Sequence, residues 1–136
     1  YASLSLSLRD IITWARFVVE VLSTSEMMIW EALCHGASLM HLDGLGLGTG
    51  LSRDDAISIK KRSVSFLLGL VPQDYQLECQ ASIHEKELRS VPTYDRFGIH
   101  PFSIPFGPQL RPAQSFNFQA PTTGSNLLRV LRAMQL

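Results

Sequence analysis

The sequence has no excess of charge of either sign. Twelve lysines and arginines balance twelve aspartates and glutamates, so the formal net charge at pH 7 is zero. Proteins that bind nucleic acid or an anionic membrane usually concentrate positive charge on one surface, and we therefore expect neither partner. Charged residues make up 18% of the chain, against about 25% in soluble domains. This low fraction indicates either a surface that is normally covered or a compact, well-packed monomer.

Cysteines and long apolar runs are also scarce. The two cysteines, Cys34 and Cys79, are too few and too far apart for a disulfide framework or a zinc motif. We expect each to be a small buried or half-buried side chain in a reducing compartment. No apolar run approaches the ~20 residues that span a bilayer. The first residues lack the features of a signal peptide, and the absent initiator methionine is consistent with a fragment or a processed product.

Prolines are absent from the first half of the chain, because all seven lie at Pro72 or later. Helices can therefore run without interruption up to that point. Apolar residues at helical spacing predict a first helix over 7–22 and a third over 53–70, the latter capped by Ser52. Between them, Ser23 and Glu26 have the spacing of a capping box and predict the start of a second helix that reaches residue 40.

The faces of these helices predict how they pack. The expected buried face of the first helix comprises Leu8, Ile11, Ile12, Ala15, Val18, Val19 and Leu22, widened by Trp14, Phe17 and Val21. Ser5 or Ser7 is the expected cap of that helix. In the second helix, the small residues Gly36, Ala37 and Ser38 would let a neighbouring helix approach closely.

The pattern changes after Pro72. Residues 80–89 are compatible with a short helix, and the proline-rich stretch 97–118 predicts short edge strands and polyproline segments. Thr122 or Thr123 is the expected cap of a last helix. That helix would turn Leu127, Leu128, Leu131 and Met134 inward and Arg129 and Arg132 outward. The expected fold class is mainly α: a helical bundle, then an extended proline-rich segment, then a C-terminal helix.

No constellation of residues predicts an independent enzyme. The glycines from Gly44 to Gly50 follow a helix and precede no lysine, so a flexible loop explains them better than a phosphate-binding loop. The four histidines show no metal-ligand spacing, and we expect surface or hydrogen-bonded roles for them. Arg9, in the first turn of an apolar helix, either forms a surface salt bridge or reaches a phosphate with its planar guanidinium.

Four stretches together resemble one protein family. They are residues 6–14 (LSLRDIITW), residues 35–37 with 42–46 (HGA and LDGLG), residues 101–108 (PFSIPFGP), and residues 118–136 (FQAPTT continuing to RVLRAMQL). Their content and order resemble the midasin family, the giant dynein-related AAA+ ATPases that carry six AAA+ modules in one chain. The resemblance implies that the sequence crosses a junction between two modules. Residues 1–70 would form an AAA+ lid-like helical subdomain, 71–94 a linker or insertion, and 95–136 the N-terminal segment of the next module.

The resemblance also implies roles for particular residues. Arg9 would be the sensor-2 arginine, which contacts the terminal phosphate of ATP in the preceding module. The turn formed by Ala120, Pro121, Thr122 and Thr123 would lie near the adenine of the next module's nucleotide. ATP and Mg²⁺ are the cofactors expected in the parent protein. This sequence has no Walker A or Walker B motif, so we expect it to bind no cofactor by itself and to be inactive as an ATPase alone.

The parent's function, by resemblance, is ATP-driven remodelling of precursor large ribosomal subunits (pre-60S particles) and release of their assembly factors, in the nucleolus and nucleoplasm. The expected partners are the rest of the AAA+ ring and those assembly factors. A lid separated from its ring would expose apolar faces and self-associate. The alternative is a small helical protein-interaction module with no nucleotide role.

Overall fold

A computed structural model describes residues 6–45, 50–85, 94–109 and 120–136 of the chain. The described elements are five α-helices, two short helical turns of other types and one two-stranded sheet, which confirms the expected mainly α fold class. The chain divides into two compact units, residues 1–84 and 85–135. Each unit is described by itself below. The domain boundaries expected at residues 70 and 94 stay a prediction.

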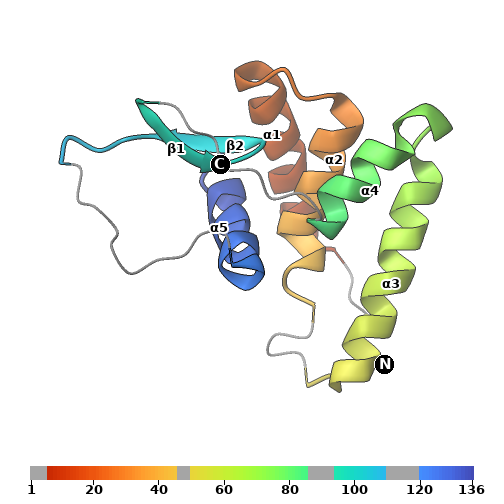
Figure 1. Ribbon diagram of the computed structural model, residues 1–136. Coiled ribbons are helices and arrows are strands. Elements are labelled where there is room, and N and C mark those ends of the chain that lie inside the picture. The colour runs from red at the N-terminus through yellow and green to blue at the C-terminus, as the bar shows by residue number, and fades with distance from the viewer. Residues whose placement is uncertain (1–5, 46–49, 86–93, 110–119) are drawn as a thin grey trace. The chain divides into compact units, whose positions relative to one another are not determined.

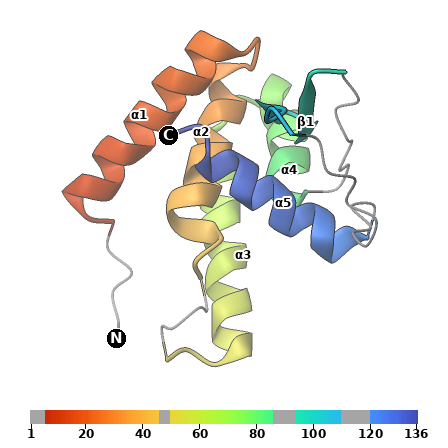
Figure 2. The same cartoon turned by 90° about the vertical axis from the view of Figure 1, so that its left-hand side faces the viewer.

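The first unit is helical. It contains α1 (Leu8–Thr24), α2 (Ile29–Ala37), a π-helical turn η1 (Ser38–Leu42), α3 (Arg53–Leu70), a 3-10 turn η2 (Gln73–Tyr75) and α4 (Gln76–His84). Helix α2 is central, because it packs against both α1 and α4, and α4 in turn contacts α3. Figure 1 shows this order of α1, α2, α4 and α3, and Figure 2 shows α1 and α3 on different sides of α2. Among the described residues, no helix is both long and apolar enough to cross a bilayer.

A serine hydroxyl group caps the start of α1, but no serine caps the start of α2. Ser7 caps α1, as predicted: its Oγ accepts from the Asp10 backbone N–H at 3.2 Å, and Asp10 Oδ2 accepts from the Ser7 backbone N–H at 2.9 Å. The predicted capping box at Ser23 and Glu26 is wrong. The Ser23 hydroxyl instead donates to the Glu20 carbonyl oxygen at 2.8 Å, inside the last turn of α1. Helix α2 starts later, after Met28, without a side-chain cap.

The buried face of α1 differs from the predicted one. Phe17, Val18 and Val21 are buried and Trp14 is half-buried. The other expected core positions are exposed, at 73% for Leu8, 49% for Ile11, 47% for Ile12, 68% for Val19 and 36% for Leu22. Both stripes are apolar, so periodicity could not choose between them. The structure favours the stripe with the two aromatic rings, which bury the larger apolar area.

The contact between α1 and α2 depends on a missing side chain. A Cβ atom on Gly36 would overlap the Trp14 indole ring and lie 3.2 Å from Phe17 Cδ1. The Trp14 indole N–H donates to the Leu33 carbonyl oxygen at 3.1 Å. Close approach of a neighbouring helix at the small residues of α2 is therefore confirmed.

A second apolar cluster joins α2, α3 and α4. Its buried members are Cys34, Leu42, Val64, Val71, Cys79 and Ile83. Helix α3 has the predicted bounds and the predicted Ser52 cap, whose Oγ accepts from the Asp55 backbone N–H at 3.1 Å. Helix α4 overlaps the short helix expected over 80–89 but begins earlier. The Gln76 side-chain amide fixes that start by donating to the Leu68 and Val71 carbonyl oxygens at 3.3 and 3.0 Å.

The second unit combines a hairpin with one helix. Strands β1 (Arg96–Ile99) and β2 (Phe102–Pro105) pair antiparallel around a cis His100–Pro101 peptide bond. Both strands pack on α5 (Pro121–Ala133), through the buried side chains of Ile99, Phe102, Leu128 and Leu131. Short strands in the proline-rich stretch are thus confirmed over 96–105. The rest of that stretch from residue 110 lies outside the described residues.

Helix α5 departs from its prediction at both ends. Its N-cap is Ala120, and neither Thr122 nor Thr123 caps it, because Pro121 occupies the first helical position and starts the helix without a hydroxyl group. Arg132, expected outside, is fully buried, whereas Met134 is 56% exposed. Burial at Arg132 and exposure at Met134 show that the buried face of α5 is not the predicted one.

Candidate functional site

Arg9 lies on a rigid, capped helix start. It is the second residue of α1, its side chain is exposed, and the Ser7–Asp10 capping box fixes the turn around it. The Thr13 hydroxyl donates to the Arg9 carbonyl oxygen at 2.9 Å. Within the described residues, the structure gives no ion pair or hydrogen bond to the Arg9 guanidinium. The surface salt bridge considered for Arg9 is therefore not found among them, and the charge faces outward.

The electrostatics of this turn favour an anion. The amide dipoles of α1 add partial positive charge at its N-terminus, next to the Arg9 side chain. Hydrogen bonds from the Ser7 side chain and backbone lower the pKa of Asp10, and the nearby Arg9 charge lowers it further. Asp10 therefore stays ionised, and its carboxylate accepts the hydrogen bonds of the cap. It neutralises only part of the positive charge that Arg9 and the helix N-terminus supply together. Such a turn has the chemistry to bind a phosphate group.

The turn 120–123 belongs to the second unit and starts α5. Ala120 and Thr123 are half-buried, while Pro121 and Thr122 are exposed. The Gly124 backbone N–H donates to the Ala120 carbonyl oxygen at 2.9 Å and closes the first helical turn. Ala120 provides no side-chain cap for the first backbone N–H groups of α5, which have no acceptor within the helix itself. The assignment of Arg9 and of this turn to nucleotide sites stays a prediction.

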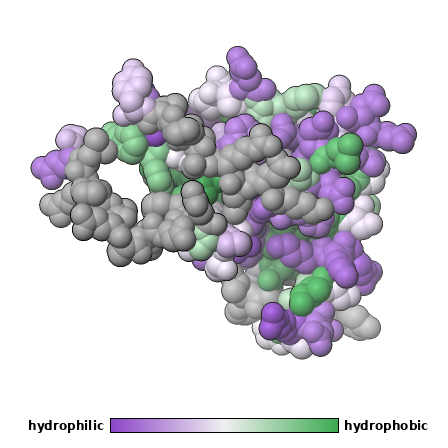
Figure 3. Space-filling view, viewed as in Figure 1, coloured by the Kyte–Doolittle hydropathy of each residue, from purple (hydrophilic) through white to green (hydrophobic). Residues whose placement is uncertain are grey.

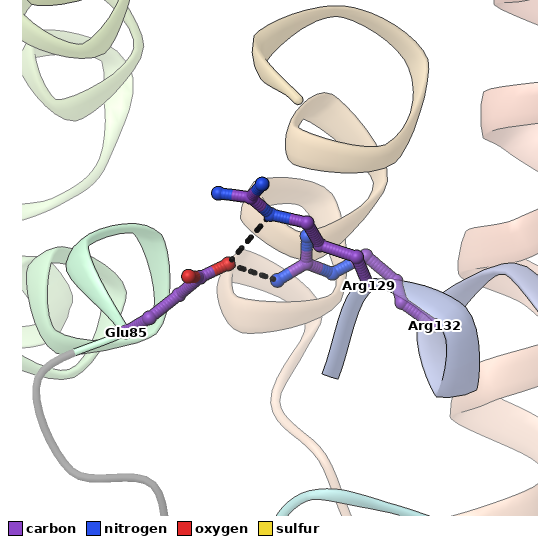
Figure 4. Close-up of polar contacts among 3 residues, drawn as sticks. All are labelled: Glu85, Arg129 and Arg132. Atoms are coloured by element: carbon purple, nitrogen blue, oxygen red, sulfur yellow. Dashed lines mark ion pairs between the residues drawn. The ribbon is translucent and has the colours of Figure 1, made fainter. Parts of the chain in front are cut away.

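A partly buried charge cluster in the second unit was missed from the sequence. Figure 4 shows Arg129 and Arg132 both directed at Glu85. Arg129 Nε and Arg132 Nη2 each lie 3.7 Å from Glu85 Oε1. Glu85 has a φ of 53°, in the left-handed region that favours glycine. The i, i+3 spacing of the arginines predicts that they share a face, but no local pattern points to a carboxylate so far back in the sequence.

Three further residues with reactive or titratable side chains, Cys34, Cys79 and His35, are buried. Cys34 and Cys79 are free thiols in the same apolar cluster, fully buried as expected. Burial raises the pKa of both thiols, which makes them poor nucleophiles. His35 is buried and has an interaction partner. Among the described residues, no three His, Cys, Asp or Glu side chains gather to hold a metal ion.

A groove in the first unit was also missed. It has a volume of about 1100 Å³ and lies between the start of α1, the η1 turn and α3. Its lining is mostly apolar and includes Leu6, Trp14, Leu42, Ile59, Phe66 and Leu70. Ile59, Phe66 and Leu70 all come from α3. Three separate elements build the groove, so no single stretch of sequence could predict it.

The described residues thus define a mainly helical segment that offers an outward arginine, an apolar groove and no metal cluster. No protein-family model and no solved structure matches the chain. The chain is 33% identical over 143 aligned residues to midasin from Dictyostelium discoideum, in an alignment that covers 96% of this chain and 2% of midasin. It therefore spans about 2% of the length of that curated relative. The similarity supports a midasin-like segment related to the AAA+ ATPases, as the sequence motifs predict.

Proposed function

We propose that this chain acts as the nucleotide-sensing lid and inter-module connector of a midasin-like AAA+ ATPase. The observation that carries the proposal is the outward Arg9 side chain on a capped helix start, with no ion pair from the described residues. The match to midasin across nearly the whole chain supports the AAA+ setting. In that setting the parent would remodel pre-60S ribosomal particles and release assembly factors in the nucleus, and its partners would be the rest of its ring and those factors.

The proposed mechanism couples a phosphate contact to helix movement. Arg9 would bind the terminal phosphate of ATP through its guanidinium N–H groups. Helix α1 is locked to α2 by the Trp14–Gly36 contact and the Trp14–Leu33 hydrogen bond, so the two helices would move together. Loss of the phosphate on hydrolysis would release Arg9 and shift both helices, which is a hinge-type switch.

The turn 120–123 would serve a second nucleotide, in the next module. The Pro121 ring offers an apolar surface for an adenine, and the uncapped N–H groups beside it would donate to ring nitrogens. The chain supplies no Walker A lysine and, within its described residues, no carboxylate cluster for Mg²⁺. ATP and Mg²⁺ would therefore be held chiefly by other parts of the parent, and the isolated chain should show no ATPase activity.

The decisive experiment replaces Arg9 by alanine in the full-length protein that contains this segment. Loss of a charged hydrogen bond to phosphate costs about 1.5–3 kcal/mol, so ATP turnover should fall about tenfold or more. Arg16→Ala is the matched control, because Arg16 is an exposed arginine on the same helix. Circular dichroism should show the same helix content in both variants. Equal turnover in the two variants would contradict the nucleotide role.

The groove favours a second candidate function. A small helical interaction module would use such a groove to accept a partner, with no role for ATP. Under this alternative, Arg9→Ala would leave activity unchanged and substitutions in the groove would abolish partner binding. ATP turnover of Arg9→Ala, measured beside partner binding of a groove variant, therefore separates the two candidates.

A further inference from the structure

Two buried thiol groups meet inside the first unit. Cys34 on α2 and Cys79 on α4 are fully buried in one apolar cluster, and α2 packs directly on α4. A side-chain hydrogen bond joins the two thiols. The sulfur atoms of a disulfide are about 2 Å apart, so two thiols in contact need only a small further approach to form one.

The two sulfur atoms are not equivalent. Burial raises the pKa of both thiols, and the Glu31 carboxylate adds to this effect at each of them. The hydrogen bond between the thiols acts in opposite directions: it raises the pKa of Cys34, the S–H donor, and lowers that of Cys79, the acceptor. Glu78 raises the pKa of Cys79. Cys79 is therefore the sulfur that the pair ionises first, while the closed fold holds both thiols protonated.

Helix α4 is the element whose movement would expose the pair. It buries only Cys79 and Ile83, one helical turn apart, whereas α2 buries five of its nine residues. Figure 3 shows mainly hydrophilic side chains, with apolar ones between them, where α3 and α4 lie. The Ser82 hydroxyl donates to Glu31 Oε1 on α2 at 3.2 Å. A helix with so few buried side chains opens locally at a lower free energy than the whole fold, and Cys79 leaves the cluster with it.

We propose that Cys34 and Cys79 form a reversible disulfide that fastens α2 to α4 when a hydroperoxide oxidises the chain. With α4 open, the Cys79 thiolate attacks one oxygen of the hydroperoxide and the O–O bond breaks. Cys79 becomes a sulfenic acid, and the other oxygen takes up a proton and leaves as an alcohol, or as water from hydrogen peroxide. With α4 closed again, the Cys34 sulfur attacks the Cys79 sulfur. The S–O bond breaks, and the hydroxyl group leaves as water with the Cys34 thiol proton.

The two thiols together lose two electrons, which the peroxide bond gains. The new bond closes a loop that contains the whole of α3 (Arg53–Leu70). Such a link restricts the unfolded chain and stabilises the fold. In a reducing compartment the disulfide would be transient, and its removal by a thiol would again require α4 to open. The proposal does not depend on a nucleotide role for Arg9.

The test is oxidation of the whole reduced chain by hydrogen peroxide at low chain concentration. Peptide mapping without reductant should find Cys34 linked to Cys79 within one chain, and Tm should rise by roughly 10 °C. A thiol reductant should reverse both changes. Cys34→Ala and Cys79→Ala are the matched controls, and peroxide should not raise the Tm of either. All three proteins contain the same four methionines, so methionine oxidation affects them alike.

A sulfenic-acid probe then identifies the sulfur that reacts first. Cys34→Ala retains Cys79 and should be labelled faster than Cys79→Ala, because Cys79 leaves the cluster when α4 opens. Four outcomes would overturn the proposal. They are labelling of Cys79 in the parent chain without any link to Cys34, links only between separate chains, a link that does not raise Tm, and faster labelling of Cys79→Ala than of Cys34→Ala.

Discussion

At the scale of single residues, the absence of a side chain at Gly36 matters most. The Trp14 indole occupies the space where a Cβ atom would be. Gly36→Ala would raise helix propensity, yet the methyl group must displace the indole ring and strain its hydrogen bond to Leu33. We expect a loss of about 1–3 kcal/mol in the free energy of unfolding, measured by urea denaturation.

A second glycine provides the control for this prediction. Gly69 lies in α3, and a Cβ atom there would meet no atom within 4 Å. Gly69→Ala should therefore stabilise the chain by roughly 0.5–1 kcal/mol through helix propensity alone. A stabilising effect of Gly36→Ala would mean that α1 does not approach α2 as the structure describes.

Asp10 links the stability of α1 to pH. The hydrogen bonds from Ser7 lower its pKa below the ordinary value of 3.8. A carboxylate with a lowered pKa stabilises the fold above its unfolded pKa, and this contribution is lost as the pH falls through the folded value. We therefore expect α1 to open more readily below about pH 4, as measured by amide hydrogen exchange. In Asp10→Asn this part of the pH dependence should disappear. In Ser7→Ala it should only become smaller, because the Ser7 backbone N–H still donates to Asp10 Oδ2.

At the scale of elements, sequence patterns located the ends of a helix where a capping serine and a proline mark them. The bounds of α3 were predicted because Ser52 caps its start and the Val71–Pro72 step ends it. The prediction of the buried face of α1 was wrong because apolar residues occupy more than one side of that helix. Only contact with Gly36 on another element selects the Trp14 and Phe17 side.

The candidate sites also differ in whether a local stretch of sequence marks them. Family resemblance pointed to Arg9, and the local cap explains why Arg9 lies at the start of a helix. The groove and the charge cluster depend on residues from separate elements, so neither had a local signal. Arg132 shows why: a helical wheel places an arginine outside, but a distant carboxylate makes its burial possible.

Helix α5 should depend on the carboxylate of Glu85. Glu85→Gln keeps the shape and the backbone conformation but removes the negative charge between Arg129 and the fully buried Arg132. Breaking a buried ion pair costs about 3 kcal/mol, so the amides of α5 should exchange faster by about two orders of magnitude. Arg129→Gln is the comparison. Its side chain is 39% exposed, and its loss should cost less than about 1 kcal/mol. Equal losses of stability in Glu85→Gln and Arg129→Gln would show that Arg132 stays buried without its ion pair to Glu85.

At the scale of the whole molecule, zero net charge and exposed apolar surface act together. Little electrostatic repulsion opposes contact between copies. The α1 stripe of Leu8, Ile11, Ile12, Val19 and Leu22 remains at least 36% exposed along its length. A stripe of this kind normally marks a surface that another element covers. In a solution of this chain alone, only another copy of the chain can cover the α1 stripe.

We therefore expect the isolated chain to self-associate through α1. Each stripe residue that becomes buried contributes about 1.5 kcal/mol, which is enough to offset part of the entropy cost of association. Ile11→Lys should raise the dissociation constant at least about tenfold, because it removes apolar area and adds like charge to both copies. Ile57→Lys adds the same charge at a 48% exposed position on α3, away from the stripe, and should have a much smaller effect. Sedimentation velocity over a range of concentrations measures both. A chain that stays monomeric at high concentration would mean that the α1 stripe is too weak an interface to act without the rest of the parent protein.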